Sequence, residues 1–202
     1  MARPGRAAGR GRKARFILVG GGARSGKSRF ALQLAERLGR RRVFLATAQG
    51  FDDEMRARID RHRQERGAGF ATVEEPLALP EAIERITAAG DADVVLVDCL
   101  TLWLSNLLMR DEDEALAARR IDELVRAVAA RRCHLVLVSN EVGLGLVPET
   151  ALGRLFRDLT GHAHQRLSAI ADELYVAIMG QVVRWRPGPV KLVRPAAADR
   201  LR

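Results

Sequence analysis

Aromatic residues and cysteines are scarce in this chain of 202 residues. Aromatic side chains make up only 4% of it, which leaves few rings on which nucleic-acid bases could stack. The two cysteines, Cys99 and Cys133, lie far apart and have no partner cysteine or histidine at metal-ligand spacing. We therefore expect two buried thiols that behave as small apolar groups, and no cysteine metal site.

Long apolar segments are absent as well. No run approaches the roughly 20 apolar residues that a membrane helix needs, and the run from Val94 to Val97 ends at Asp98. Residues 1–15 are basic and lack the apolar centre of a secretory signal. A cytoplasmic protein without a membrane span is therefore expected.

Acidic residues are missing from residues 1–15, although the chain as a whole carries a formal net charge of +9. Such an excess suggests anionic partners, with nucleic acid first among them. However, six of the excess charges lie in residues 1–15, and the remainder of about +3 is ordinary. We predict a basic, disordered tail at 1–15, one folded domain at 16–186 and a loose segment at 187–202, with no nucleic-acid partner.

Short apolar runs alternate with helical patterns along the domain. The runs that predict strands are 16–20, 42–46, 94–98, 134–140 and 173–180, with 182–185 pairing back through a turn at 180–181. The helical patterns cover 27–39, 52–66, 80–89, about 101–109, 112–131 and 149–172. This alternation predicts an α/β fold with a mostly parallel sheet and helices on both faces. Ligands of such sheets bind beyond the carboxyl ends of the strands, where every motif described below lies.

Residues 21–28, Gly-Gly-Ala-Arg-Ser-Gly-Lys-Ser, match the phosphate-binding pattern G-x-x-x-x-G-K-[ST] between a predicted strand and a predicted helix. Backbone N–H groups of such a loop point at phosphate oxygens, and the helix adds its positive N-terminal end. Lys27 would reach the β- and γ-phosphates, and the Ser28 hydroxyl would ligate Mg²⁺. Asp98, at the end of an apolar strand, would help to hold the same ion. The motif predicts a nucleoside triphosphate site but does not identify the reaction.

His62 is the histidine with a candidate chemical role. In a helix at 52–66 it shares a face with Met55, Ile59 and Arg66, and the two apolar residues would anchor that face against the body. An imidazole held near the α-phosphate could attack it, which would form a nucleotidyl-histidine and release pyrophosphate. Spacing alone favours an ordinary polar residue here. The remaining histidines are expected to have surface or structural roles: His134, His162 and His164.

Several longer segments occur in an order that resembles one family. They are GGARSGKS (21–28), ATAQ (46–49), DDEMRARIDRHRQER (52–66), VDCLTLWLSNLL (97–108), LVSNEVGLGLVPE (137–149) and RLFRDLTGHAHQRLSAIADELYVAIMG (154–180). The succession is similar to the adenosylcobinamide kinase/adenosylcobinamide-phosphate guanylyltransferase family of cobalamin biosynthesis, over about residues 16–185. The DDEM and SNEVG segments are much more specific than any phosphate-binding loop.

The resemblance implies a RecA-like P-loop fold, a homo-oligomer and two reactions. ATP or GTP phosphorylates adenosylcobinamide, and GTP then donates GMP to that phosphate through a GMP-histidine, giving adenosylcobinamide-GDP. It implies His62 as the nucleophile and Lys27 as a further catalytic group, with Mg²⁺ held by Ser28 and Asp98. The nucleotide contacts that it implies are Gly21, Gly22, Ala23, Arg24, Ser25, Gly26, Lys27, Ser28, Ala46, Thr47, Ala48, Arg63, Gln64, Glu65, Arg66, Glu74 and Asp98.

Two other functions stay open on the sequence. A plain P-loop small-molecule kinase would transfer the γ-phosphate without a covalent intermediate, and His62 would then be dispensable. A RecA-like ATPase or nucleic-acid-binding module would bind DNA or RNA in a salt-sensitive way. Asn140 and Glu141, at the end of the strand 134–140, are further candidates for contact with a γ-phosphate or a polar substrate.

Overall fold

The computed structural model describes residues 13–50, 53–111 and 113–193, without the side chains at positions 54, 58, 62 and 65–67. The helices are α1 (Lys27–Leu38), α2 (Asp53–Arg66), α3 (Leu79–Ala89), α4 (Leu100–Asp111), α5 (Glu114–Ala129) and α6 (Ala151–Ile170), with a 3₁₀ turn, η1 (Gly67–Gly69). The strands are β1 (Phe16–Gly21), β2 (Arg42–Ala46), β3 (Ala71–Glu74), β4 (Val94–Asp98), β5 (His134–Asn140), β6 (Glu173–Ile178), β7 (Gln181–Arg186) and β8 (Lys191–Val193).

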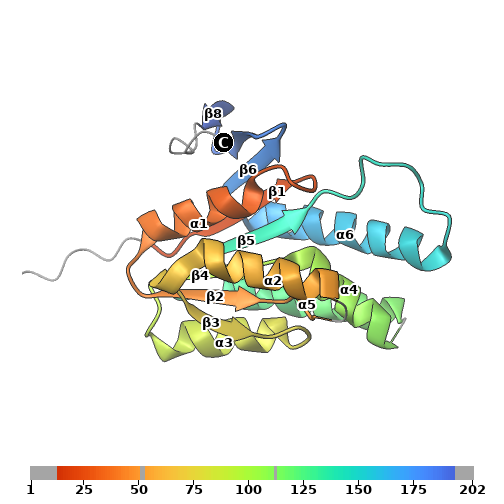
Figure 1. Cartoon of the computed structure of the whole chain (residues 1–202), viewed down its shortest axis with the longest axis horizontal. Coiled ribbons are helices and arrows are strands. Elements are labelled where there is room, and N and C mark those ends of the chain that lie inside the picture. Colours follow the sequence, from red (N-terminus) through yellow and green to blue (C-terminus); the bar gives the residue numbers. More distant parts are fainter. Residues whose placement is uncertain (1–12, 51–52, 112, 194–202) are drawn as a thin grey trace, which may run out of the picture.

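All of these strands form one sheet in the order β3-β2-β4-β5-β1-β6-β7-β8 (Figure 1). The first six strands in this order are parallel, and β7 and β8 continue the sheet in antiparallel pairing. The mostly parallel α/β sheet predicted from the sequence is therefore confirmed. Because β1 to β6 run the same way, their carboxyl ends meet at one edge, and the loops that follow them are neighbours there.

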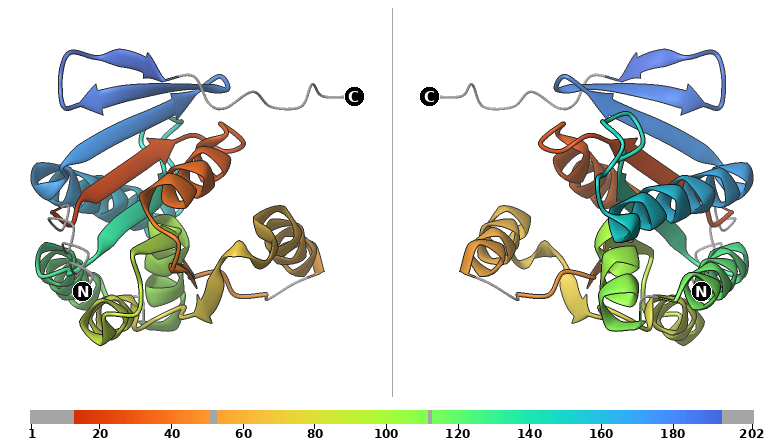
Figure 2. Two further views of the ribbon diagram at one scale, coloured as in Figure 1. Left: turned by 90° about the vertical axis from the view of Figure 1, so that its left-hand side faces the viewer. Right: turned by 90° about the vertical axis from the view of Figure 1, so that its right-hand side faces the viewer.

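Helices cover both faces of the sheet, as predicted. Phe16 and Leu18 of β1 point into a core shared with α3, α4, α5 and α6, whereas Ile17 and Val19 point into a second core with α1. Successive side chains of a strand point to opposite faces, so a continuous apolar run supplies both cores. In Figure 2, α1 and α2 lie on one side of the sheet and α3, α5 and α6 on the other.

Two short strands lie where the sequence analysis predicts none. β3 has only four residues, and most of its side chains are exposed at the sheet edge, so it lacks the apolar run that marks a buried strand. β8 pairs with β7 within residues 187–202, which were expected to be loose. That expectation is corrected for 191–193, and residues 194–202 lie outside the described part.

The folded part also includes Arg15, which the sequence analysis assigned to the basic tail. Its backbone N–H donates to Nδ1 of His134 at 3.1 Å, and its guanidinium pairs with Glu173. The other carboxylate oxygen of Glu173 accepts a 2.5 Å hydrogen bond from the hydroxyl of Tyr175. Arg15 is therefore part of the domain, and His134 has a structural role. Residues 1–12 of the predicted tail lie outside the described part.

Candidate active site

A cavity of about 670 Å³ opens at the carboxyl edge of the sheet. Its floor comes from the phosphate-binding loop and from the ends of β2, β3, β4 and β5, and one wall comes from α2. The strand-end and loop residues that line it include Lys27, Ser28, Ala46, Ala48, Glu74, Asp98 and Asn140. The residues contributed by α2 are Met55, Arg56, Ile59, Asp60 and Arg63. The fold thus gathers candidates that are far apart in the sequence.

The phosphate-binding loop has a backbone that its glycines make possible. Gly21 has a φ of 156°, and a Cβ there would lie 2.4 Å from the carbonyl oxygen of Ala177. Gly26, directly before α1, has a φ of 91°, a value that side-chain-bearing residues rarely adopt. Lys27 is mostly buried, and its amino group donates to the carbonyl oxygen of Gly22 at 3.0 Å. A phosphate bound in the loop would contact this ammonium group directly.

Ser25 in the same loop carries a buried hydroxyl oxygen that has no hydrogen-bond partner among the described residues. Buried polar atoms are nearly always paired, so an unpaired hydroxyl in a phosphate-binding loop indicates a ligand partner. Together with the backbone N–H groups of the loop, it fits an anion such as a nucleotide phosphate.

The ends of β2, β4 and β5 are joined by a small hydrogen-bond network behind the cavity. The fully buried hydroxyl of Thr47 accepts from the N–H of Cys99 at 2.8 Å and donates to its carbonyl oxygen at 2.7 Å. The amide of Asn140 donates to the hydroxyl of Thr101 at 2.8 Å. Burial raises the pKa of the Cys99 thiol to about 11, so it stays neutral, and both cysteines are free and buried as expected. This network fixes the backbone that follows Asp98.

Glu74 and Arg63 form an ion pair between the end of β3 and α2, and both line the cavity. Both side chains are more than half exposed, so a nucleotide could displace the pair at little cost. Ala46 and Ala48 also line the cavity, whereas the side chain of Thr47 is taken up by Cys99. The sequence-derived contacts in this part of the site thus lie together.

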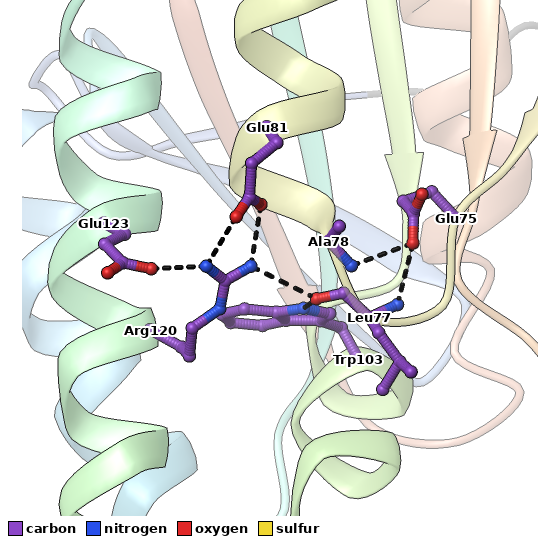
Figure 3. A network of polar contacts seen from close by, with 7 residues as sticks. All are labelled: Glu75, Leu77, Ala78, Glu81, Trp103, Arg120 and Glu123. Carbon is purple, nitrogen blue, oxygen red and sulfur yellow. Dashed lines mark hydrogen bonds and ion pairs between the residues drawn. The ribbon is translucent and has the colours of Figure 1, made fainter.

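The segment that follows Glu74 is held by residues that the sequence analysis does not single out (Figure 3). Arg120 of α5 donates two 2.7 Å bonds to the carboxylate of Glu81, which lowers the pKa of that acid. The indole N–H of Trp103 donates to the carbonyl oxygen of Leu77 at 2.8 Å. Asn106 of α4 supports the site from behind, since its buried amide donates to the carbonyl oxygens of Thr47 and of Pro76, which lines the cavity. These contacts join residues that are distant in the sequence, so no local sequence pattern predicts them.

His62 lies in α2, three residues after Ile59. Its side chain lies outside the described part, as do those of Glu65 and Arg66, so their predicted roles stay predictions. Gln64 is exposed. Met55 and Ile59 are half-buried and line the cavity, so the side of α2 expected to face the body does face the site.

His164 on α6 connects the end of β5 to that helix. Its Nε2 lies 2.7 Å from the hydroxyl oxygen of Ser139, and its Nδ1 lies 3.6 Å from a carboxylate oxygen of Glu141. Burial lowers the pKa of His164, and the charge of Glu141 partly opposes that shift. Ser139 is fully buried, so its hydroxyl is not an exposed nucleophile. The contact with His164 instead orients the carboxylate of Glu141. His162 on the same helix is exposed.

Ser28 and Asp98 line the same cavity from the loop and from β4. A hydroxyl and a carboxylate are the oxygen ligands that Mg²⁺ prefers, and the ion usually takes its remaining ligands from substrate phosphates and water. The described residues contain no cluster of three or more His, Cys, Asp or Glu side chains suited to a metal. The donor set therefore fits Mg²⁺ that arrives with a nucleotide. Within the described part, no helix is long and apolar enough to cross a membrane.

A phosphate-binding loop after β1, an acid at the end of β4 and a single strand, β5, between them define a RecA-like P-loop nucleotide-binding protein. The model of the family described as cobinamide kinase / cobinamide phosphate guanyltransferase matches residues 17–185. The chain belongs to this family.

Three relatives are named as proteins of adenosylcobalamin biosynthesis. The bifunctional adenosylcobalamin biosynthesis protein CobP of Pseudomonas aeruginosa is 42% identical over 163 residues, which are 81% of this chain and 92% of the relative. The proteins named CobU of Salmonella typhimurium and Escherichia coli are each 42% identical over 82% of this chain and 96% of their own length. Among solved structures, the flagellar accessory protein FlaH of Methanocaldococcus jannaschii matches with a TM-score of 0.49 at 12% identity, over 90% of this chain and 79% of that one. The RadB recombinase matches with a TM-score of 0.49 at 15% identity, over 89% of this chain and 86% of that one.

Proposed function

We propose that this chain is a bifunctional enzyme that phosphorylates adenosylcobinamide and then transfers GMP from GTP to the resulting phosphate. The observation that carries the proposal is the single cavity in which the phosphate-binding loop and Asp98 face helix α2, which bears His62. Membership of the family and three relatives named as bifunctional adenosylcobalamin biosynthesis proteins support the same reading.

In the kinase step, the triphosphate lies in the loop with its γ-phosphate near Lys27. The hydroxyl oxygen of adenosylcobinamide attacks the γ-phosphorus, the bond to the β–γ bridging oxygen breaks, and water accepts the hydroxyl proton. Lys27 and the backbone N–H groups of the loop stabilise the charge that develops on the phosphate oxygens. Ser28 and Asp98 would hold Mg²⁺, which supplies charge neutralisation on the phosphates. Either ATP or GTP fits these groups, since they contact phosphates only.

In the transferase step, an imidazole nitrogen of His62 attacks the α-phosphorus of GTP. The bond to the α–β bridging oxygen breaks, and pyrophosphate leaves. A phosphate oxygen of adenosylcobinamide phosphate then attacks the GMP-histidine, which yields adenosylcobinamide-GDP and restores the histidine. This divides one difficult transfer into two easier ones. Arg63 and Glu74 contact the nucleotide once their mutual ion pair opens, a role supported by their position in the lining of the cavity.

We further propose a homo-oligomer. Apolar side chains that are more than half exposed gather on β6, β7, β8 and their connections: Ile178, Met179, Trp185, Val190 and Leu192. Apolar surface of this kind on a water-soluble chain marks interaction sites, and a second copy of the chain would cover it. Size-exclusion chromatography with light scattering tests this, and a monomer at micromolar concentration would contradict it.

The covalent intermediate gives the sharpest test of function. The protein is incubated with Mg²⁺ and GTP labelled either at the α- or at the γ-phosphate, beside His62→Ala and a control, His162→Ala, which changes an exposed histidine of α6. We expect acid-labile, alkali-stable α-label on the wild type and the control, and none on His62→Ala. Absence of α-label from all three would favour the plain kinase.

Deletion of residues 1–12 tests the nucleic-acid-binding alternative. That alternative requires the truncated domain to bind DNA or RNA in a salt-sensitive way.

A further inference from the structure

An exposed apolar loop rises from the floor of the cavity. Residues 141–150 connect β5 to α6, and the preceding residue, Asn140, lines the cavity. Leu144 is 88% exposed, Leu146 96% and Val147 64%. Figure 1 shows this connection projecting beyond the carboxyl edge of the sheet. We name it the apolar loop, residues 141–150.

Hydrogen bonds to backbone and side-chain groups hold the apolar loop at both ends. At its base, the N–H of Glu141 donates to the carbonyl oxygen of Gly21 in the phosphate-binding loop at 3.0 Å. The carboxylate of Glu141 accepts from the N–H of Gly143 at 2.7 Å. At its far end, Arg154 of α6 donates to the carbonyl oxygens of Pro148 and Glu149 at 3.1 and 2.7 Å. The apolar side chains are therefore presented to solvent by a braced backbone, and they do not fold back onto the domain.

The cavity is large enough for the nucleotide but not for the corrinoid as well. A volume of about 670 Å³ lies within the range of roughly 300–1,000 Å³ that holds one drug-sized ligand, such as a nucleotide. The acceptor of the proposed reactions is a corrinoid, a macrocycle far larger than a nucleotide. It cannot share the cavity with a triphosphate, so its ring must rest outside while its hydroxyl-bearing arm enters. The ring needs an apolar surface that is continuous with the cavity.

We propose that the apolar loop is the docking surface for the corrin ring of the acceptor, with Leu144, Leu146 and Val147 packed against the ring. This inference rests on the proposed function, since it assigns the acceptor to a surface beside the same cavity. The base of the loop is bonded to Gly21 of the phosphate-binding loop through Glu141, and Asn140 directly before it lines the cavity, so the apolar loop adjoins the site. Burial of exposed leucine side chains provides the affinity.

The test uses the double variant Leu144→Ser/Leu146→Ser in the full-length protein. Both side chains are exposed, so the variant keeps its fold. The control is Met109→Ser, another exposed apolar residue. It lies near the end of α4 and does not line the cavity. Three quantities are measured: KM for adenosylcobinamide in the kinase reaction, its Kd by equilibrium dialysis, and α-label transfer from GTP to the protein without corrinoid.

We expect KM and Kd for adenosylcobinamide to rise at least about tenfold in the double variant, since full burial of one leucine is worth more than that factor. Self-labelling by GTP should stay within about twofold of wild type, because surface substitutions away from the site have small effects. Met109→Ser should match wild type in all three measurements.

Unchanged KM and Kd in the double variant would overturn the docking proposal. A changed oligomeric state with unchanged acceptor affinity would do so too, and would assign the apolar loop to contact with a second copy. A parallel loss of self-labelling would also overturn it, because the apolar loop would then act on the nucleotide site and not on the acceptor alone. If the wild type neither labels itself nor phosphorylates the acceptor, the proposed function fails. The dialysis arm then still decides whether the apolar loop binds a corrinoid.

Discussion

One added methyl group at Gly21 should destabilise the fold, because the backbone around this residue leaves no room for a side chain. Gly21 ends β1 between Asn140 of β5 and Ala177 of β6, with a φ of 156°. A Cβ built there would lie 2.4 Å from the carbonyl oxygen of Ala177 and 2.8 Å from the hydroxyl oxygen of Ser25. The first of these atoms is backbone in the middle of the sheet, so it cannot rotate away. Gly21→Ala must therefore move either β6 or the phosphate-binding loop.

The cost follows from two contributions. A backbone conformation that favours glycine costs of order 1–3 kcal/mol when another residue adopts it. Overpacking against a fixed atom adds typically 1–3 kcal/mol. We expect Gly21→Ala to lower the free energy of unfolding by about 3 kcal/mol, a large share of the 5–15 kcal/mol that stabilises a typical protein. For a chain of this size, that corresponds to a fall in Tm of roughly 6–12 °C.

The assay is urea and thermal unfolding of the nucleotide-free protein, followed by circular dichroism. The matched control is Gly22→Ala in the same loop, because a Cβ at Gly22 meets no atom within 4 Å. Its unfolding free energy should stay within about 0.5 kcal/mol of wild type. Equal stability of Gly21→Ala and Gly22→Ala would refute the argument that β6 forces a glycine at the start of the loop.

Two further predictions concern the supports of the site and the opposite edge of the sheet. Asn106→Ala removes both amide hydrogen bonds to Thr47 and Pro76 and leaves their carbonyl groups unpaired, so unfolding should become easier by about 2–4 kcal/mol, with kcat reduced; wild-type stability in urea would contradict this. Hydrogen bonds from Arg41 lower the pKa of Asp93 from 3.8 to about 2. The stability that Asp93 contributes is therefore present above pH 4 and lost as pH falls towards 2. Because both side chains of the pair are partly exposed, we expect this contribution to stability to be small, and an Asp93→Asn variant whose acid unfolding curve equals that of wild type would rule it out.

Local patterns predict those parts of the fold in which adjacent residues perform one task. The strand, glycine loop and helix at the start of the domain form one continuous segment, and its sequence pattern defines its structure as well as its ligand. The same holds for Asp98, because an apolar run that ends in an acid predicts both the strand and the position of the carboxylate. Once these strands are parallel, the meeting of their ends at one cavity follows from topology.

The parts that the sequence does not predict depend on partners distant in the chain. Asn106 is an ordinary polar residue of a helix until the fold brings it under the carbonyl groups of Thr47 and Pro76. Arg15 reads as one of many basic tail residues, and its contacts with Glu173, His134 and the backbone of Leu135 make it part of the domain. β3 and β8 have three or four residues each, too few for a period to be recognised.

The apolar loop shows why exposure carries information that residue identity does not. The run from Glu141 to Thr150 contains glycines and a proline, so from sequence it is simply a connection, and its leucines could equally fold inward. In the structure, one backbone bond from Glu141 to Gly21 ties this connection to the phosphate-binding loop. A movement of that loop on nucleotide binding that shifts Gly21 would be transmitted to the base of the apolar loop through the same bond. The nucleotide and the large acceptor are therefore expected to affect each other's binding, and Kd for adenosylcobinamide measured with and without a bound nucleotide should differ. Equal values would mean that the two loops move independently.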